Sequence, residues 1–211
     1  MKYNYIAIEG NIGAGKTTLA TKISEQFNAK LILEQFADNP FLPKFYENPD
    51  QYAFPLELSF LASRYNQLKD ELSRQDLFRS FTISDYIINK TIIFAQKTLQ
   101  GDEYALFTKL FSIINTTLPK PDLLVYLYVN IENLKRNIIK RARSYEQNMD
   151  PDYLAKLQEG YLTFIKSQHN MRTLIIDTNN IDFVNNEKDY KEISEFIING
   201  EYDYGITRVS L

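Results

Sequence analysis

One short stretch near the start of the chain, residues 3–27, constrains the possible folds more than any other part. Residues 5–8 form an apolar run typical of a buried strand, and from residue 19 apolar side chains recur at helical spacing. Between these segments lies GNIGAGKT, residues 10–17, which matches the pattern G-x4-G-K-[ST]. A strand, a glycine-rich turn and a helix in this order predict a loop that binds the phosphates of a nucleotide.

Each part of this loop has a chemical use. Its glycines allow tight backbone turns in which successive N–H groups point at a polyphosphate, and the following helix directs its positive end to the same place. Lys16 supplies a positive charge for the outer phosphates, and the Thr17 hydroxyl suits a magnesium ion. We therefore predict ATP and Mg²⁺ as ligands. The predicted ATP-binding residues of the loop are Gly10, Asn11, Ile12, Gly13, Ala14, Gly15, Lys16, Thr17 and Thr18.

Composition argues against several other classes of protein. The 211 residues suit one domain with a sizeable core, and the formal net charge of −3 argues against a nucleic-acid-binding surface and against attraction to acidic membranes. The absence of cysteine excludes disulfides and thiolate metal sites, and a single histidine leaves little scope for histidine chemistry. No apolar run has membrane-spanning length, and the first strand begins too early for a signal peptide to precede it. We expect a soluble, cytoplasmic protein.

Apolar runs and helical patterns alternate along the rest of the chain. After the first strand, further strands are predicted at residues 29–33, 78–83, 123–129 and 173–177. The predicted helices cover residues 42–46, 57–72, 87–99, 104–117, 131–141, 151–169 and 189–198. Strands that are apolar on both faces and alternate with helices indicate an α/β fold with a five-stranded parallel sheet flanked by helices. The sequence leaves open whether residues 200–211 form a loose tail or a packed extension.

Charged residues follow several of the predicted strands. Glu34 and Asp85 come directly after the second and third strands, so both should lie with the phosphate loop at the edge of the sheet where ligands bind. Glu34 is a candidate general base and Asp85 a candidate magnesium ligand, although an exposed carboxylate or a helix cap would also fit these positions. Arg141 and Arg143 suit a lid, residues 140–148, that stabilises a transferring phosphoryl group; a solvated helix end is the alternative.

Five sequence blocks resemble, in order and at the expected separations, the deoxyribonucleoside kinase family, and within it the bacterial deoxyguanosine and deoxyadenosine kinases. They are GNIGAGKTT (10–18), Glu34 after the second strand, FYENPDQYAFPLELSFLASRYNQL (45–68), SDYIINKTIIFA (84–95) and RARSYEQ (141–147). The resemblance covers residues 6 to about 198. It implies a three-layer P-loop kinase fold, a homodimer by analogy, and transfer of the γ-phosphoryl group of ATP to a deoxyribonucleoside.

The same resemblance implies roles for individual residues. Glu34 stands where the family keeps the general base for the 5′-hydroxyl, and Tyr46 and Glu146 match the pair that holds the 3′-hydroxyl. Arg64 and Glu57 match residues that face the base. The remaining implied roles are base stacking for Phe94, the lid arginines Arg141 and Arg143, which would act with Lys16 on the phosphates, and contact with the donor adenine for Ile181, Asp182 and Phe183.

Two departures from the family pattern concern the recognition of the base. Many members have an Asp/Glu-Arg-Ser triplet after the third strand, whereas this chain has Asp85-Tyr86-Ile87. Where those members carry an acidic base-contacting residue on the next helix, this chain has Lys90. Both departures occur together in bacterial members that resemble deoxyguanosine kinases.

These residues favour guanine. An ionised Glu57 only accepts hydrogen bonds, and guanine offers two adjacent donors, N1–H and its amino group. Arg64 and Lys90 would then lie near the guanine acceptors O6 and N7. Alternatively, Glu57 and Arg64, seven residues apart on one helix, pair with each other and do not determine the base.

We therefore predict an ATP-dependent kinase that phosphorylates the 5′-hydroxyl of a purine deoxyribonucleoside, with deoxyguanosine preferred. Alternatives are a deoxyadenosine or broad-specificity deoxynucleoside kinase, a nucleoside monophosphate or other small-metabolite kinase, and a nucleotide-dependent switch without an acceptor. An anionic acceptor is disfavoured because Arg64 and Lys90 are the only candidate cations on the predicted acceptor side.

Overall fold

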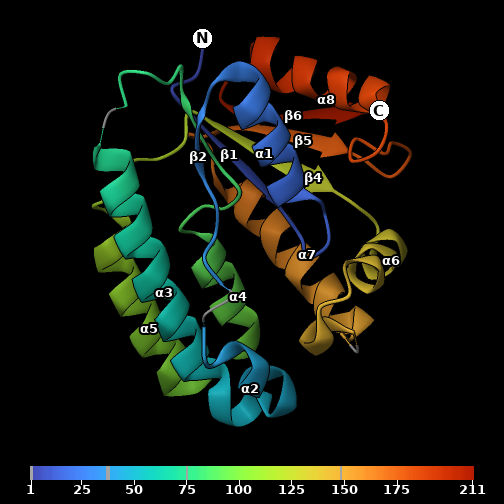
Figure 1. Cartoon of the computed structure of the whole chain (residues 1–211). Coiled ribbons are helices and arrows are strands. Elements are labelled where there is room, and N and C mark those ends of the chain that lie inside the picture. Colours follow the sequence, from blue (N-terminus) through green and yellow to red (C-terminus); the bar gives the residue numbers. More distant parts are fainter. Residues whose placement is uncertain (1, 37–38, 75, 148) are drawn as a thin grey trace.

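The computed structural model of the chain describes residues 2–36, 39–74, 76–147 and 149–211. Within these residues, parallel strands form one six-stranded sheet in the order β2-β3-β1-β4-β5-β6 (Figure 1). The strands are β1 (Tyr5–Gly10), β2 (Lys30–Ile32), β3 (Thr82–Ser84), β4 (Leu123–Tyr128), β5 (Arg172–Asp177) and β6 (Gly205–Ser210).

Helices connect the strands and cover the sheet. They are α1 (Lys16–Phe27), α2 (Leu42–Glu47), α3 (Pro49–Ser73), α4 (Lys90–Thr98), α5 (Gly101–Asn115), α6 (Ile131–Arg141), the 3₁₀ turn η1 (Ser144–Glu146), α7 (Pro151–Ser167) and α8 (Glu187–Asn199). Asn148, the last residue of the predicted lid, lies outside the described residues. No helix in the described part of the chain combines the length and apolar character needed to cross a membrane.

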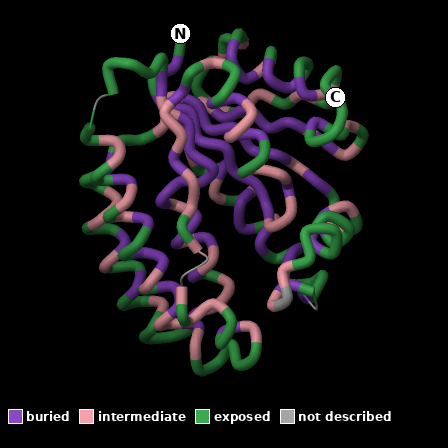
Figure 2. Tube along the Cα trace, viewed as in Figure 1, coloured by how far each residue is buried: buried purple, intermediate pink, exposed green. Residues whose placement is uncertain are grey.

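The alternation of side chains along the strands divides the helices between two faces of the sheet. In β1, Ile6 and Ile8 join a core cluster with α1, α6 and α8, whereas Tyr5 and Ala7 join a cluster with α4 and α7 on the other side. A third apolar cluster joins α2, α3, α4 and α5. Figure 1 shows α3 and α5 side by side at one flank, and Figure 2 shows the buried residues concentrated in the central strands.

The predicted α/β fold with a parallel sheet between helices is confirmed, but the predicted count of five strands is wrong. Residues 205–210 form β6, which pairs in parallel with all of β5. Its residues are alternately half-buried and exposed, as in an edge strand with one covered face. The segment GITRVS has no continuous apolar run, which is why the pattern that identified the other strands does not extend to it. The end of the chain is thus a packed extension.

The third strand also differs from the prediction, because it begins at Thr82 and not at Phe78. The residues before it form a turn, in which the Asp76 carboxylate accepts the N–H of Phe78 at 3.0 Å and the Asp76 carbonyl accepts the N–H of Arg79 at 3.2 Å. This turn leaves Phe78 86% exposed, outside the sheet. An apolar residue next to a strand was therefore mistaken for part of it.

Candidate active site

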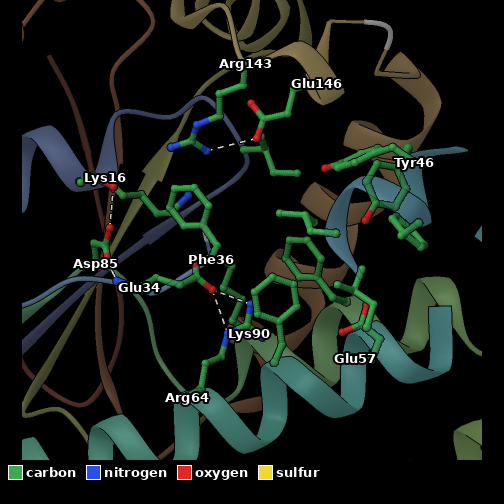
Figure 3. A pocket seen from close by; sticks show the side chains of 18 of the residues that line it. Lys16, Glu34, Phe36, Tyr46, Glu57, Arg64, Asp85, Lys90, Arg143 and Glu146 are labelled. Carbon is green, nitrogen blue, oxygen red and sulfur yellow. Dashed lines mark hydrogen bonds and ion pairs between the residues drawn. The ribbon is translucent and has the colours of Figure 1, made fainter. Parts of the chain in front are cut away.

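The parallel topology brings the loops after β1, β2 and β3 to one edge of the sheet, where they form one wall of a pocket (Figure 3). The pocket encloses about 750 Å³ of space, including the part open to solvent. Aromatic and charged side chains from separate elements line it, a combination found in small-molecule sites. Its lining residues are Ile12, Lys16, Thr17, Glu34, Phe36, Leu42, Phe45, Tyr46, Leu56, Glu57, Phe60, Arg64, Asp85, Lys90, Phe94, Arg141, Arg143, Glu146 and Tyr153.

The phosphate loop is held in shape by its own polar groups. The Lys16 ammonium donates to the carbonyls of Gly10 at 3.0 Å and Asn11 at 2.9 Å, which keeps its side chain folded over the loop. The Asn11 side chain donates to the carbonyl of Leu154 in α7 at 2.7 Å and accepts the N–H of Ile12 at 2.9 Å. Burial and the nearby charge of Lys90 lower the pKa of Lys16 to about 8, so that it is still mostly protonated at neutral pH.

Gly15 has no room for a side chain. Its φ is +86°, and a Cβ at this position would lie 2.7 Å from Cζ of Phe183, which belongs to the segment predicted to contact the donor adenine. Phe183 is buried against the loop, whereas Asp182 is exposed and its carboxylate accepts the N–H groups of Val184 and Asn185. The structure therefore brings the aromatic side chain of this segment, but not the carboxylate, against the phosphate loop.

Gly15→Ala is expected to weaken ATP binding by about tenfold or more, because the clash must displace either Phe183 or the loop. Gly101→Ala is the matched control, since Gly101 also has a positive φ, +53°, but no atom lies within 4 Å of its Cβ position. The control should lose about 1 kcal/mol of stability and keep its ATP affinity. Calorimetric titration with ATP measures both variants, and equal losses of affinity would contradict the steric explanation.

Thr17 and Asp85, the predicted magnesium ligands, lie together. The Thr17 hydroxyl donates to Oδ2 of Asp85 at 2.5 Å, and the N–H of Glu34 donates to Oδ1 at 2.7 Å. One hydroxyl and one carboxylate fit Mg²⁺, which in nucleotide sites is held by one or two protein oxygens together with phosphates and water. Among the described residues there is no group of three or more His, Cys, Asp or Glu that could hold a metal ion by itself.

Glu34, the predicted general base, forms ion pairs with two buried cations, Arg64 and Lys90. Its Oε1 accepts from Nε and Nη2 of Arg64 at 2.8 and 2.6 Å, and its Oε2 accepts from Nζ of Lys90 at 2.5 Å (Figure 3). Burial raises the pKa of this carboxyl, but the charges and hydrogen bonds of Lys90 and Arg64 outweigh burial and hold it below its ordinary range. Glu34 is therefore ionised in this state.

Arg64 does not pair with Glu57, so that alternative for the two residues is wrong. Its third donor, Nη1, goes to the Thr91 hydroxyl at 2.9 Å, and its guanidinium lies over the ring of Phe60 at 4.5 Å. Both Arg64 and Glu57 are buried, so neither faces solvent. The side chain of Glu34 reaches Arg64 from another element, which the spacing of residues along one helix does not reveal.

Glu57 has an incomplete set of hydrogen bonds. Its Oε1 accepts the Thr98 hydroxyl at 3.0 Å, and its buried Oε2 has no hydrogen-bond partner among the described residues. Burial raises the pKa of Glu57 from 4.5 to about 7, against the opposing effects of Arg64, Thr98 and Lys90. Near neutral pH the carboxyl is therefore partly protonated, and its protonated form can also donate a hydrogen bond.

The shifted pKa of Glu57 makes stability depend on pH. Between pH 4.5 and about 7 the folded state holds a proton that the unfolded state has lost, so stability falls as the pH rises through this interval. Relative to wild type, Glu57→Gln should gain about 3 kcal/mol of unfolding free energy between about pH 5 and about pH 8. Denaturant unfolding at the two pH values, with Glu47→Gln at an exposed glutamate as control, measures this gain. A pH-independent difference would contradict it.

The predicted lid residues lie across the pocket from Arg64 and Glu57 (Figure 3). Arg143 donates to Oε1 of Glu146 at 3.2 Å, and Arg141 pairs with Oε2 of the same carboxylate. Tyr46 stacks on Tyr145, the neighbour of Glu146 in the chain, with ring centroids 5.8 Å apart. Tyr46 and Glu146, the residues predicted to hold the 3′-hydroxyl, both line the pocket. The Arg143 guanidinium lies 4.1 Å from the centre of the Phe36 ring. The lid is thus in contact with the segment that carries Glu34.

The predicted base-stacking residue, Phe94, is half-buried in the pocket wall. Its ring packs edge-on against Tyr161 with centroids 6.3 Å apart, and Nζ of Lys90 lies 5.6 Å from its centre. Lys90 itself is directed at Glu34 and not at Glu57. The structure therefore pairs Lys90 with Glu34, the predicted general base.

Sequence reasoning missed several polar residues that support the site. Glu9 is buried at the end of β1, and its carboxylate accepts the N–H groups of Gly10 at 3.2 Å and Ile87 at 3.0 Å and the Tyr161 hydroxyl at 3.0 Å. Burial raises its pKa. Glu9 therefore connects the phosphate loop to the segment after β3. Its signal in the sequence is a charged residue directly between the apolar run of residues 5–8 and the phosphate loop. No pattern in the sequence predicted that Tyr153 lines the pocket.

Comparison with known proteins agrees with this geometry. The sequence profile of the family described as deoxynucleoside kinase matches residues 6–199. The chain is 37% identical over 197 residues to the deoxyguanosine kinase of Bacillus subtilis (strain 168), covering 92% of this chain and 95% of that protein. It is 28% identical over 209 residues to the deoxyadenosine/deoxycytidine kinase of the same organism, covering 96% and 95%.

The fold is also found in a solved structure. A solved structure of deoxyadenosine kinase from M. mycoides with bound dATP is similar to this chain with a TM-score of 0.79 at 22% identity, covering 92% of this chain and 98% of the other. The profile spans the phosphate loop, Glu34 with its two cationic partners, and the lid, all of which line one pocket. This protein therefore belongs to the deoxynucleoside kinase family.

Proposed function

We propose that this protein transfers the γ-phosphoryl group of ATP to the 5′-hydroxyl of a purine deoxyribonucleoside, with deoxyguanosine preferred. The observation that carries the proposal is the position of Glu34, a partly buried, ionised carboxylate between the phosphate loop and the aromatic part of the pocket. The similarity to the deoxyguanosine kinase of Bacillus subtilis supports the choice of base. The similarity to a deoxyadenosine/deoxycytidine kinase makes deoxyadenosine the second candidate.

Glu34 is proposed to take the proton of the 5′-hydroxyl. Its pairing with Arg64 and Lys90 holds it ionised but also makes it a weak base. A nucleoside base that accepts hydrogen bonds from Arg64 would draw the guanidinium away from Glu34 and raise its basicity. Binding of the acceptor and activation of the base would thereby be coupled through one side chain.

The cations around the phosphate loop are proposed to stabilise the transferring phosphoryl group. Lys16 lies on the loop, and Arg141 and Arg143 reach the same pocket from the lid. Thr17 and Asp85 would hold Mg²⁺, which when bound neutralises charge on the donor phosphates. Release of the two arginines from Glu146 would free them for the phosphates and free the carboxylate for the 3′-hydroxyl, together with Tyr46.

We also propose that residues 1–211 act as one cytoplasmic domain and assemble as a homodimer. The site needs ATP, which is abundant in the cytoplasm, and the family resemblance implies dimerisation through helices beside the sheet. Exposed apolar residues on these helices support this: Leu106 (50% exposed) and Ile113 (68%) on α5, and Leu58 (38%) on the adjoining α3. Sedimentation should give twice the chain mass, and Ile113→Glu should give monomers; a wild-type monomer would contradict the dimer.

The function is tested by offering the four deoxyribonucleosides side by side with Mg-ATP. The expected result is turnover of the purine nucleosides with deoxyguanosine first. Nucleoside monophosphates are the control acceptors, and they should not be phosphorylated because the carboxylate of Glu34 in the pocket wall repels a second phosphate. Turnover of a monophosphate without turnover of any nucleoside would overturn the proposal.

A further inference from the structure

The free oxygen of Glu57 is the least satisfied polar atom in the pocket wall. Glu57 is 2% exposed and lines the pocket together with Phe60, Phe94 and Tyr153. The Thr98 hydroxyl lies 3.0 Å from Oε1 and 3.1 Å from the carbonyl of Phe94, and this contact holds the carboxyl so that Oε2 is left for a ligand. A buried polar atom without a partner costs free energy unless a ligand supplies the missing hydrogen bond.

The charges around Glu57 do not fix its protonation state. Arg64, on the same helix, uses Nε and Nη2 for Glu34 and Nη1 for Thr91, and Lys90 of α4 is also paired with Glu34. Glu34, from the segment after β2, adds a negative charge that opposes ionisation, and Tyr153 of α7 and Tyr46 of α2 face the pocket with uncharged hydroxyls. With both cations engaged elsewhere, the neutral and ionised forms of Glu57 are both accessible near neutral pH.

The two forms offer opposite hydrogen-bonding groups at Oε2. An ionised carboxylate accepts a hydrogen bond there, whereas a neutral carboxyl that carries its proton on Oε2 donates it. The two purines offer complementary groups at N1: guanine has an N–H donor there, and adenine has a lone pair that accepts. Neither base changes its own protonation near neutral pH.

We propose that the carboxyl of Glu57 contacts N1 of the purine in both of its protonation states, as the carboxylate for deoxyguanosine and as the neutral acid for deoxyadenosine. The base preference of the enzyme therefore changes with pH. This inference rests on the proposed function, because it assumes that a purine nucleoside occupies the pocket. It makes Glu57 a switch between two substrates, where a glutamine at the same position would accept both without responding to pH.

The base preference should change with pH in one direction and with a defined slope. Turnover of deoxyguanosine follows the ionised fraction of Glu57, and turnover of deoxyadenosine follows the protonated fraction. The ratio of the two kcat/KM values, deoxyguanosine over deoxyadenosine, therefore rises about tenfold for each unit of pH. Protonation of Glu34, Lys16 or the phosphates of ATP affects both substrates and cancels in the ratio.

The test is a competition assay in which the enzyme phosphorylates a mixture of the two nucleosides at about pH 6, 7 and 8. The wild-type ratio should rise about 100-fold across the series. Glu57→Gln, which cannot titrate, should give a ratio that does not change with pH. Thr98→Val removes the donor that favours the carboxylate, so its ratio should be shifted towards deoxyadenosine at every pH. A flat wild-type ratio, or a Glu57→Gln ratio as steep as that of wild type, would overturn the proposal.

Binding without ATP gives an independent readout. Calorimetry in buffers of different ionisation enthalpy should show proton release when deoxyguanosine binds below the pKa of Glu57, and proton uptake when deoxyadenosine binds above it. Binding of both nucleosides without any proton exchange would overturn the inference and leave the kinase function in place. Failure to bind or phosphorylate any deoxynucleoside would overturn the proposed function and this inference with it.

Discussion

Glu34→Gln is expected to lower kcat about 10³-fold without weakening ATP binding, because it removes the only proposed acceptor for the proton of the 5′-hydroxyl. Glutamine has nearly the same shape and keeps one oxygen for Arg64, but its NH2 group cannot accept from Lys90, whose ammonium loses this partner. Glu34 lies outside the phosphate loop, and the hydrogen bonds that hold Lys16 on the loop do not involve it. The loss should therefore appear in the chemical step.

Single-turnover kinetics with saturating Mg-ATP measures this step, and a binding titration measures ATP affinity. Glu47→Gln, at an exposed glutamate of α2, controls for the change in total charge and should behave as wild type. A Glu34→Gln enzyme with wild-type kcat would show that the proton leaves by another route. A variant that loses ATP affinity to the same degree as kcat would show that Glu34 acts on the phosphate loop and not on the acceptor.

Lys16→Met is expected to lower kcat about 10²- to 10³-fold, the usual effect of removing one charged group that stabilises a transition state. The ammonium lies within reach of two carbonyls of the phosphate loop, so a bound polyphosphate enters a site where this charge is already in place. Methionine keeps the apolar length of the side chain and removes only the charge and its hydrogen bonds.

Stopped assays under saturating ATP and nucleoside report kcat, and Lys135→Met, at an exposed lysine of α6, is the control. Because the pKa of Lys16 in the free enzyme is about 8, the wild-type kcat/KM for ATP should also fall as the pH rises through this value, and the Lys16→Met variant should lack that fall. A wild-type profile that stays level through this range would contradict the assignment of the charge to Lys16.

Much of the fold follows from local sequence patterns. The phosphate loop lies between a buried strand and an amphipathic helix, and the helix at residues 131–141 has the predicted bounds, with Asn130 accepting the N–H of Asn133 as its cap. The sixth strand could not be predicted in the same way. Residues 205–210 are half polar, and only pairing with β5 makes them a strand.

The sequence predicted which residues line the site better than it predicted which of them form ion pairs with one another. Sequence and family resemblance place Glu34, Arg64 and Lys90 in one pocket, but not the ion pairs that join them across the loop after β2 and helices α3 and α4. The protonation of Glu57 depends on how completely its surroundings exclude water and on which cations are already engaged. Burial and competition between partners are properties of the three-dimensional arrangement, so no local pattern contains them.

The most direct measurement identifies the product formed from deoxyguanosine and Mg-ATP. Chromatography against authentic 5′- and 3′-monophosphates shows which hydroxyl receives the phosphoryl group. Because the Glu34 carboxylate lies beside the phosphate loop and Glu146 lies across the pocket in the lid, we expect only the 5′-monophosphate, formed in equal amount with ADP. A 3′-monophosphate, or ADP released without any nucleotide product, would contradict the proposed orientation of the nucleoside and with it the central role of Glu34.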